Sequence, residues 1–209
     1  VLPIGQAQVQ GNWDVLGLRA TQSVDYTVSG VRIPDRHTFD FFAPVAHRGS
    51  AMHHLGVLPL TAAGHAAWAL GVTRRALDEL AASTGRVRMG APAPLAESEH
   101  VLISYARLES RWAAGRAWVH EVCAAVEAEA AERGGPPEAL SADRLRQACV
   151  HVNSEGADIA REAYLLAGTS ALRDGPLQRC FRDLHAGAQH FFASDAASID
   201  WARGLLARP

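Results

Sequence analysis

Three long stretches with helical periodicity, joined by short connections, constrain this fold more than any other feature of the sequence. Apolar residues recur every three or four positions in 60–84, in about 96–132 and in 141–168. Gly85 ends the first stretch and Gly134-Gly-Pro-Pro137 ends the second, because glycine and proline interrupt helices. Short connections between long amphipathic helices favour antiparallel neighbours. The sequence therefore predicts a mainly α protein with an up-and-down, four-helix-type bundle.

A shorter segment supplies the fourth helix of this prediction. Pro176 suits the first turn of a helix, and Asp174 is a favourable N-cap. The apolar residues that follow recur at spacings of four and three: Leu177, Phe181 and Leu184. We expect Ser141 to cap the third long helix, and Ser194 or Asp195 to cap a last helix that reaches residue 206.

Two glycines lie about two turns apart in the first long helix. Gly64 and Gly71 fall on one face, where we expect them to permit the close approach of a neighbouring helix. Glycine within a helix costs up to about 1 kcal/mol relative to alanine, so a packing role would explain its presence. This face also predicts self-association of the chain.

The first 46 residues carry turn residues and lack helical periodicity. The ranges 11–16 and 23–34 are typical of strands, with Val24, Tyr26 and Val28 alternating in the second. Two or three strands with one apolar face are not stable alone, so we expect them to pack on the helices or on sheet sequence absent from this chain. This, with the absence of an initial methionine, predicts a truncated or processed piece.

Charge and composition exclude several function classes. The formal net charge of −2 gives no reason to expect nucleic acid or an acidic membrane surface as a partner. The three cysteines are widely spaced without a Cys-x-x-Cys pattern, which favours neither a disulfide framework nor a zinc site. No apolar run approaches the roughly 20 residues that cross a bilayer. We expect a soluble, cytoplasmic protein without a Rossmann or Walker nucleotide site.

Two histidines follow the fourth helix pattern closely. His185 and His190 are five positions apart, which on a helix separates their side chains by roughly 140°. Helical metal ligands sit three or four positions apart, so no metal site is predicted. The plain alternative is that both histidines cap or line the bundle surface.

The segment Gly175-Pro-Leu-Gln-Arg-Cys-Phe-Arg-Asp-Leu-His-Ala-Gly-Ala-Gln-His190 resembles the C-terminal signature of the acyl-CoA dehydrogenase superfamily. It is most similar to the flavin-dependent monooxygenase branch. A second resemblance is to the last strands of that superfamily's central β-domain, through Gly17, Arg19, Thr21, Ser23 and Asp25. The resemblance implies that 1–46 is a remnant of the β-domain with a linker, and that 47–209 is the C-terminal helical domain.

The resemblance also implies a flavin, FAD or FMN, supplied in the reduced form. It places His190 near the reactive edge of the flavin as the catalytic residue, and a histidine can donate a hydrogen bond or relay a proton at neutral pH. It implies five cofactor-binding residues: Arg86, Arg88, Gly168, Thr169 and Arg182. There is also a plain structural alternative. In it, Arg86 and Arg88 lie in a solvated loop, Gly168 caps the C-terminus of a helix, and Arg182 forms a structural pair with Asp183.

Three functions remain open at this point. The favoured function is a two-component monooxygenase, in which a partner flavin reductase supplies reduced flavin and a small organic substrate is hydroxylated. The second is an acyl-CoA dehydrogenase with bound FAD, which the resemblance disfavours because no carboxylate follows His190 before Asp195. The third is a non-catalytic helical oligomerisation module. Flavin sites between subunits of the superfamily imply a homodimer or homotetramer.

Overall fold

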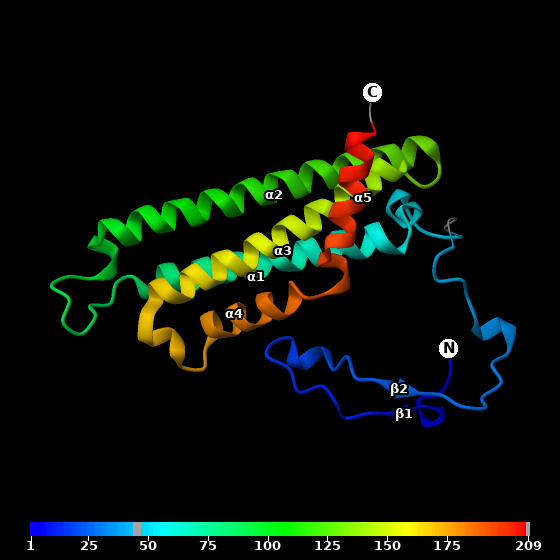
Figure 1. Cartoon of the computed structure of the whole chain (residues 1–209), viewed down its shortest axis with the longest axis horizontal. Helices are drawn as coiled ribbons and strands as arrows, with labels where there is room; N and C mark the ends of the chain where they lie inside the picture. Colours follow the sequence, from blue (N-terminus) through cyan, green and yellow to red (C-terminus); the bar gives the residue numbers. More distant parts are fainter. Residues whose placement is uncertain (44–46, 208–209) are drawn as a thin grey trace.

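The computed structural model describes residues 1–43 and 47–207, and most of this chain forms a helical bundle (Figure 1). The five α-helices are α1 (Val57–Ser83), α2 (Glu99–Arg133), α3 (Ala139–Ala167), α4 (Pro176–Gly187) and α5 (Asp195–Leu206). Helix α3 contacts the other four, while α5 crosses the end of the bundle at a steep angle. The predicted mainly α bundle is confirmed, with short 3₁₀ helices in its connections. These are Ile4–Gln6, Arg19–Thr21, Asp35–His37, Ala51–Leu55, Leu95–Glu97, Gly168–Leu172 and Phe191–Ala193.

Small residues let α1 and α3 approach closely. Alanines 62, 66, 69 and 76 of α1 are fully buried, as are alanines 148, 160 and 163 of α3. A Cβ at Gly156 would lie 2.6 Å from the hydroxyl oxygen of Thr73, so only glycine fits there without a shift. The prediction for Gly64 and Gly71 was wrong within the chain, because both are exposed and a Cβ at either would meet no atom within 4 Å.

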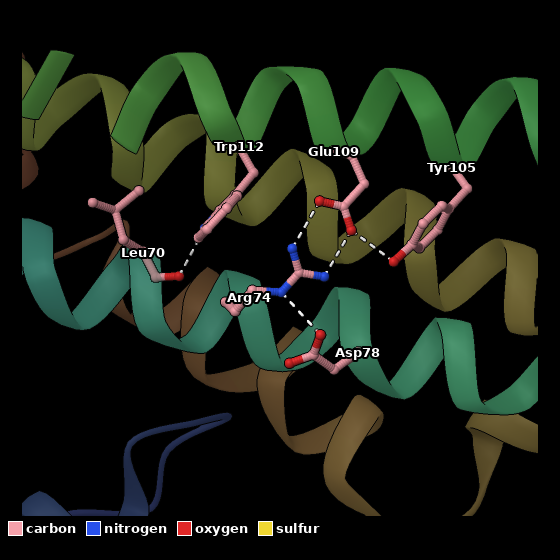
Figure 2. Close-up of polar contacts among 6 residues, drawn as sticks. All are labelled: Leu70, Arg74, Asp78, Tyr105, Glu109 and Trp112. Carbon is pink, nitrogen blue, oxygen red and sulfur yellow. Dashed lines mark hydrogen bonds and ion pairs between the residues drawn. The ribbon is translucent and has the colours of Figure 1, made fainter. Parts of the chain in front are cut away.

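A polar cluster joins α1 to α2 (Figure 2). Both terminal nitrogens of Arg74 donate to the carboxylate of Glu109 at 2.7 Å, and its Nε donates to Asp78 at 3.0 Å. The hydroxyl of Tyr105 donates to the same Glu109 carboxylate at 2.6 Å. The hydrogen bonds that Glu109 accepts, above all those from Arg74, lower its pKa. Partial burial and the nearby Glu109 raise the pKa of Tyr105, with Arg74 acting in the opposite direction.

Trp112 completes this contact between α1 and α2. Its indole N–H donates to the carbonyl oxygen of Leu70 at 3.0 Å, and the Arg74 guanidinium lies 4.9 Å from its ring centroid. A cation over an indole face is attracted by the ring quadrupole. The cluster therefore fixes the relative position of the two helices.

The N-terminal region is less regular than predicted. Strands β1 (Gln8–Val9) and β2 (Tyr26–Thr27) form one antiparallel pair, with Gln8 opposite Thr27. The prediction of a strand at 11–16 was wrong, and only part of 23–34 is a strand. In place of strand pairing, the Asn12 side chain accepts the backbone N–H of Asp25 and donates to its carboxylate. The small N-terminal β-region itself is confirmed.

Two predicted caps were wrong. Gly175 rather than Asp174 is the N-cap of α4, and the exposed carboxylate of Asp174 contacts Arg182 at 3.4 Å. Helix α3 begins at Ala139 with Glu138 as its N-cap, so Ser141 lies within its first turn. The N–H of Glu138 is already satisfied by the carboxylate of Glu129 at 2.6 Å. Helix α5 begins after Ser194, as predicted.

The sequence predicts a domain boundary between residues 46 and 47, and residue 46 lies outside the residues that the structure describes. In 1–43 and 47–207, no helix is both long and apolar enough to cross a membrane.

Candidate functional site

A cavity of about 710 Å³ lies between the N-terminal segment, α1 and the C-terminal end of α4. Its apolar wall is formed by Trp13, Val15, Leu16, Leu18, Trp68, Ala186 and Phe191. Its polar side chains are Thr21, Ser23, His65, His185, Gln189 and His190. No aspartate or glutamate is found among the described residues on these walls. The cavity is thus mostly apolar, with a small number of polar groups, as is usual for sites that bind small molecules. We call it the inner cavity.

The N-terminal wall of the inner cavity is docked on α4 at Gly17. A Cβ at Gly17 would overlap the backbone carbonyl of Arg182, so the close approach requires glycine. The N–H of Leu18 donates to the carboxylate of Asp183 at 2.7 Å, and Leu18 adopts a left-handed conformation with φ of 55°. Trp13 donates its indole N–H to the carbonyl of Leu18 at 3.2 Å. This contact gives the cavity its wall opposite α1.

Arg182 and Asp183 therefore do not form the pair considered from the sequence. Asp183 holds the N-terminal segment, and Arg182 contacts Asp174. The Nε atom of Arg182 is buried and has no hydrogen-bond partner within 1–43 and 47–207. Arg182 also lines a separate cavity of about 260 Å³ beside Gly17 and Arg179.

His190, the predicted catalytic residue, lies on the wall of the inner cavity. Its Nδ1 accepts the N–H of Phe192 at 3.3 Å, which leaves the proton of the neutral ring on Nε2. Its ring packs on the ring of Phe192 with centroids 4.9 Å apart. The backbone therefore presents His190 as a neutral donor through Nε2.

His65 of α1 is a second histidine of this site, and the sequence reasoning missed it. Its ring lies 4.7 Å from that of His190 and 5.2 Å from that of Trp68. Its Nε2 is 3.3 Å from the carbonyl oxygen of Gly187. Burial lowers the pKa of His65; the Gly187 carbonyl opposes that shift, and the nearby His190 adds to it. No local signal marks His65, because it lies in an Ala-rich helix far from the signature segment.

His185 occupies the last turns of α4 and also faces the inner cavity. Its Nδ1 is 2.7 Å from the carbonyl oxygen of Phe181, one turn earlier, and its ring lies 4.2 Å from that of Phe181. The sequence favoured a surface role for this histidine. The structure instead brings His65, His185 and His190 to one cavity.

The predicted cofactor-binding residues other than Arg182 gather at the opposite end of α4. The guanidinium of Arg88 donates to the carbonyl of Leu166 and lies over Gly168, whose φ is 67°. A Cβ at Gly168 would be 2.9 Å from Arg88 Nη2, so glycine permits this contact. Arg86 lines a smaller polar cavity of about 180 Å³, and Thr169 is exposed.

The structure thus separates the predicted site residues into two groups. His190 lies beyond the C-terminal end of α4, whereas Arg86 lines a cavity at its N-terminal end. A helix of 12 residues is about 18 Å long. One ligand would have to extend along α4 to contact both groups.

Comparisons with known proteins agree with this architecture. The family described as "Acyl-CoA dehydrogenase, C-terminal domain" matches residues 63–195. The indole-3-acetate monooxygenase of Pseudomonas putida is 31% identical over 206 residues, which cover 93% of this chain and 50% of that protein. The chain spans about half the length of the curated relatives that it matches.

Solved structures share the fold. The 3-HSA hydroxylase from Rhodococcus sp. RHA1 has a TM-score of 0.85 and 21% identity, covering 100% of this chain and 55% of that one. XiaF from Streptomyces sp., solved in complex with FADH2 and glycerol, has a TM-score of 0.83 and 18% identity, with the same coverage.

Proposed function

The chain belongs to the acyl-CoA dehydrogenase family, and from this premise we propose that the whole protein is a flavin-dependent monooxygenase acting on a small aromatic compound. The observation that carries the proposal is the inner cavity, where three histidines and aromatic walls meet without a carboxylate among its described residues. The similarity to an indole-3-acetate monooxygenase supports the same reaction class.

The runner-up, acyl-CoA dehydrogenation, needs a base that removes a proton alpha to a thioester. Neutral His190 has its Nδ1 engaged by the N–H of Phe192 and a proton on Nε2, so it is arranged as a donor. The nearest carboxylate along the chain, Asp195, lines a different cavity. These features favour oxygen chemistry over dehydrogenation.

The residues of the inner cavity fit a flavin ring and an aromatic substrate. Its volume of about 710 Å³ and its aromatic walls suit planar apolar ligands. When bound, a reduced flavin anion supplies two electrons to dioxygen, so that one oxygen atom enters the substrate, the other leaves as water, and one proton is consumed. We assign to Nε2–H of His190 the role of a hydrogen-bond donor to the reacting oxygen.

We further propose that Arg86, Arg88, Gly168, Thr169 and Arg182 contact the rest of the flavin, whether FAD or FMN. The guanidinium fork suits phosphate oxygens, and the unpartnered Nε of Arg182 offers one more donor. Arg86→Ala in the full-length protein should weaken flavin binding by about 1.5–3 kcal/mol, the range for a charge-assisted hydrogen bond. Arg107→Ala, at an exposed position of α2, is the matched control, and equal affinities of the two variants would refute the assignment.

The partners in this proposal are a flavin reductase and further copies of the chain. We propose 1–46 as part of a β-domain and 47–209 as the helical domain, within a homodimer or homotetramer. The three free cysteines fit a reducing cytoplasm. Light scattering of the full-length protein tests the assembly, and a monomer at all concentrations would contradict it.

One experiment separates the three functions. The full-length protein is given chemically reduced FMN or FAD, ¹⁸O₂ and indole-3-acetate as a probe, and the product is analysed for one incorporated label. We expect labelled product and no bleaching of bound flavin by butyryl-CoA. Bleaching by butyryl-CoA without oxygenated product would establish the dehydrogenase. Absence of both reactions and of flavin binding, with assembly of the chain in light scattering, would favour the oligomerisation module.

A further inference from the structure

A second cavity lies directly behind the histidine side of the inner cavity. Its volume is about 350 Å³, and it is formed by α3, the end of α4 and the start of α5. Two side chains, His185 and Gln189, line both cavities. We call the second one the outer cavity. The partition between the two cavities therefore contains two polar side chains, those of His185 and Gln189.

His185 has the chemistry to pass a proton across this partition. Its Nδ1 donates to the carbonyl of Phe181 at 2.7 Å, because a carbonyl oxygen can only accept. The Nε2 of the neutral ring is then without a proton and can accept one. The aromatic ring of Phe181 packs on the imidazole, with the ring centroids 4.2 Å apart.

The two cavities differ in charge. Asp158 of α3 and Asp195 of α5 line the outer cavity together with Ser154, and both carboxylates are exposed. Asp158 also lies 4.0 Å from a guanidinium nitrogen of Arg111. The titratable groups of the inner cavity, apart from His185 itself, are His65 and His190. Of the two cavities, the outer one thus has carboxylates among its described lining residues, where a proton from the solvent can bind.

We propose that His185 conducts protons from the outer to the inner cavity, with Gln189 hydrogen-bonding along the same path. The proposal rests on the proposed monooxygenase function, which consumes one proton for each flavin anion oxidised. A proton from bulk water binds Asp158 or Asp195 and moves to Nε2 of His185. His185 then releases it to the inner cavity and returns to its neutral form.

The first test measures the histidines of this chain directly, without flavin. Ring-nitrogen NMR at neutral pH should show the uncharged His185 ring with its proton on Nδ1, because Nδ1 donates to the carbonyl of Phe181 and leaves Nε2 able to accept a proton. A His185 ring with its proton on Nε2 instead would refute the route.

The second test uses the full-length enzyme. His185→Gln should lower the rate of product formation by at least about 10²-fold, the lower end for a lost proton-transfer group. Added imidazole should restore part of that rate, which a misfolded cavity would not permit. A wild-type rate in His185→Gln, or loss without rescue, would overturn the route while leaving the monooxygenase proposal intact. Failure of the wild type to oxygenate any probe would instead defeat the proposed function.

Discussion

Helix α1 presents two polar surfaces that differ in one respect. Toward α2, Arg74 is matched with Glu109 and Asp78, and none of the buried polar atoms of this cluster lacks a partner among the described residues. Toward α4, His65 lies against His190 at a cavity of about 710 Å³. The first surface uses its hydrogen bonds to join helices. On the second, Nε2 of His65 contacts the Gly187 carbonyl and Nδ1 of His190 accepts the Phe192 N–H, so that the other nitrogen of each ring is left for a ligand within the described residues.

This difference separates structural from functional polar groups better than residue type does. A fully satisfied polar network stabilises one arrangement, whereas a group that must bind a ligand cannot be satisfied beforehand. Substitutions on the α2 side should therefore change stability, and those on the α4 side should change chemistry. The following predictions test that division.

The largest expected effect is on the α4 side. His190→Ala in the full-length enzyme should lower product formed per flavin oxidised by about 10²-fold, with the balance released as hydrogen peroxide, because one donor to the reacting oxygen is lost. Its free energy of unfolding should stay within about 0.5 kcal/mol of wild type, since His190 is exposed. Product and peroxide assays beside urea unfolding measure both quantities. Unchanged product yield would remove His190 from the reaction.

The next effect is on the α2 side. Glu109→Gln should lower the free energy of unfolding by about 1–3 kcal/mol at pH 7, because Arg74 and Tyr105 lose a charged partner. The folded pKa of Glu109 lies below its ordinary value of 4.5, so the charged form stabilises the fold above that pH. The difference between variant and wild type should shrink as pH falls below 4.5. Product yield should not change, and a loss of yield would break the comparison.

A smaller effect should come from the exposed glycine of α1. Gly64→Ala meets no atom within 4 Å and should stabilise the chain by about 0.5–1 kcal/mol through helix propensity. Gly187→Ala on the α4 side is the contrast, since its Cβ would overlap the ring of Trp68 and should destabilise. Thermal unfolding of the two variants measures both signs. Destabilisation by Gly64→Ala would show that another surface packs on this glycine.

The smallest effect concerns the titration of His65. Its folded pKa is below the ordinary 6.5, so the unfolded chain binds a proton more readily, and stability should fall as pH drops below 6.5. Between about pH 7.5 and 5.5, the free energy of unfolding should therefore fall less in His65→Gln than in the wild type. Equal losses in wild type and His65→Gln would show that His65 titrates as an exposed histidine.

The bundle could be predicted because its signals are local. Periodicity and end signals predicted the five helices, since each helix needs only its own apolar face and its own capping residues. Predictions failed where a distant or side-chain partner decides the backbone. Asp174 lost its capping role to Arg182, and residues 11–16 were drawn into a loop closed by Asn12 and Asp25.

The site could be predicted only in part for the same reason. The resemblance marked His190, which lies in a contiguous signature. It did not mark His65, because 122 positions separate His65 from Gly187, the residue whose carbonyl it contacts. The resemblance implied Arg86 and Arg88 as flavin-binding residues, and Arg86 lines a cavity at the end of α4 opposite His190. Whether one flavin contacts both groups stays a prediction.

The hydrogen bond from Leu18 to Asp183 spans 165 positions and has a consequence for the order of folding. The entropic cost of closing a loop of that length is roughly 2 kcal/mol greater than for a loop a tenth as long. The helices need only short-range contacts to begin, so we expect the N-terminal segment to dock on α4 after the bundle has formed. Such late contacts also open first in native-state hydrogen exchange. The wall that encloses the reacting groups is thus the last part of the described chain to assemble and the first to release.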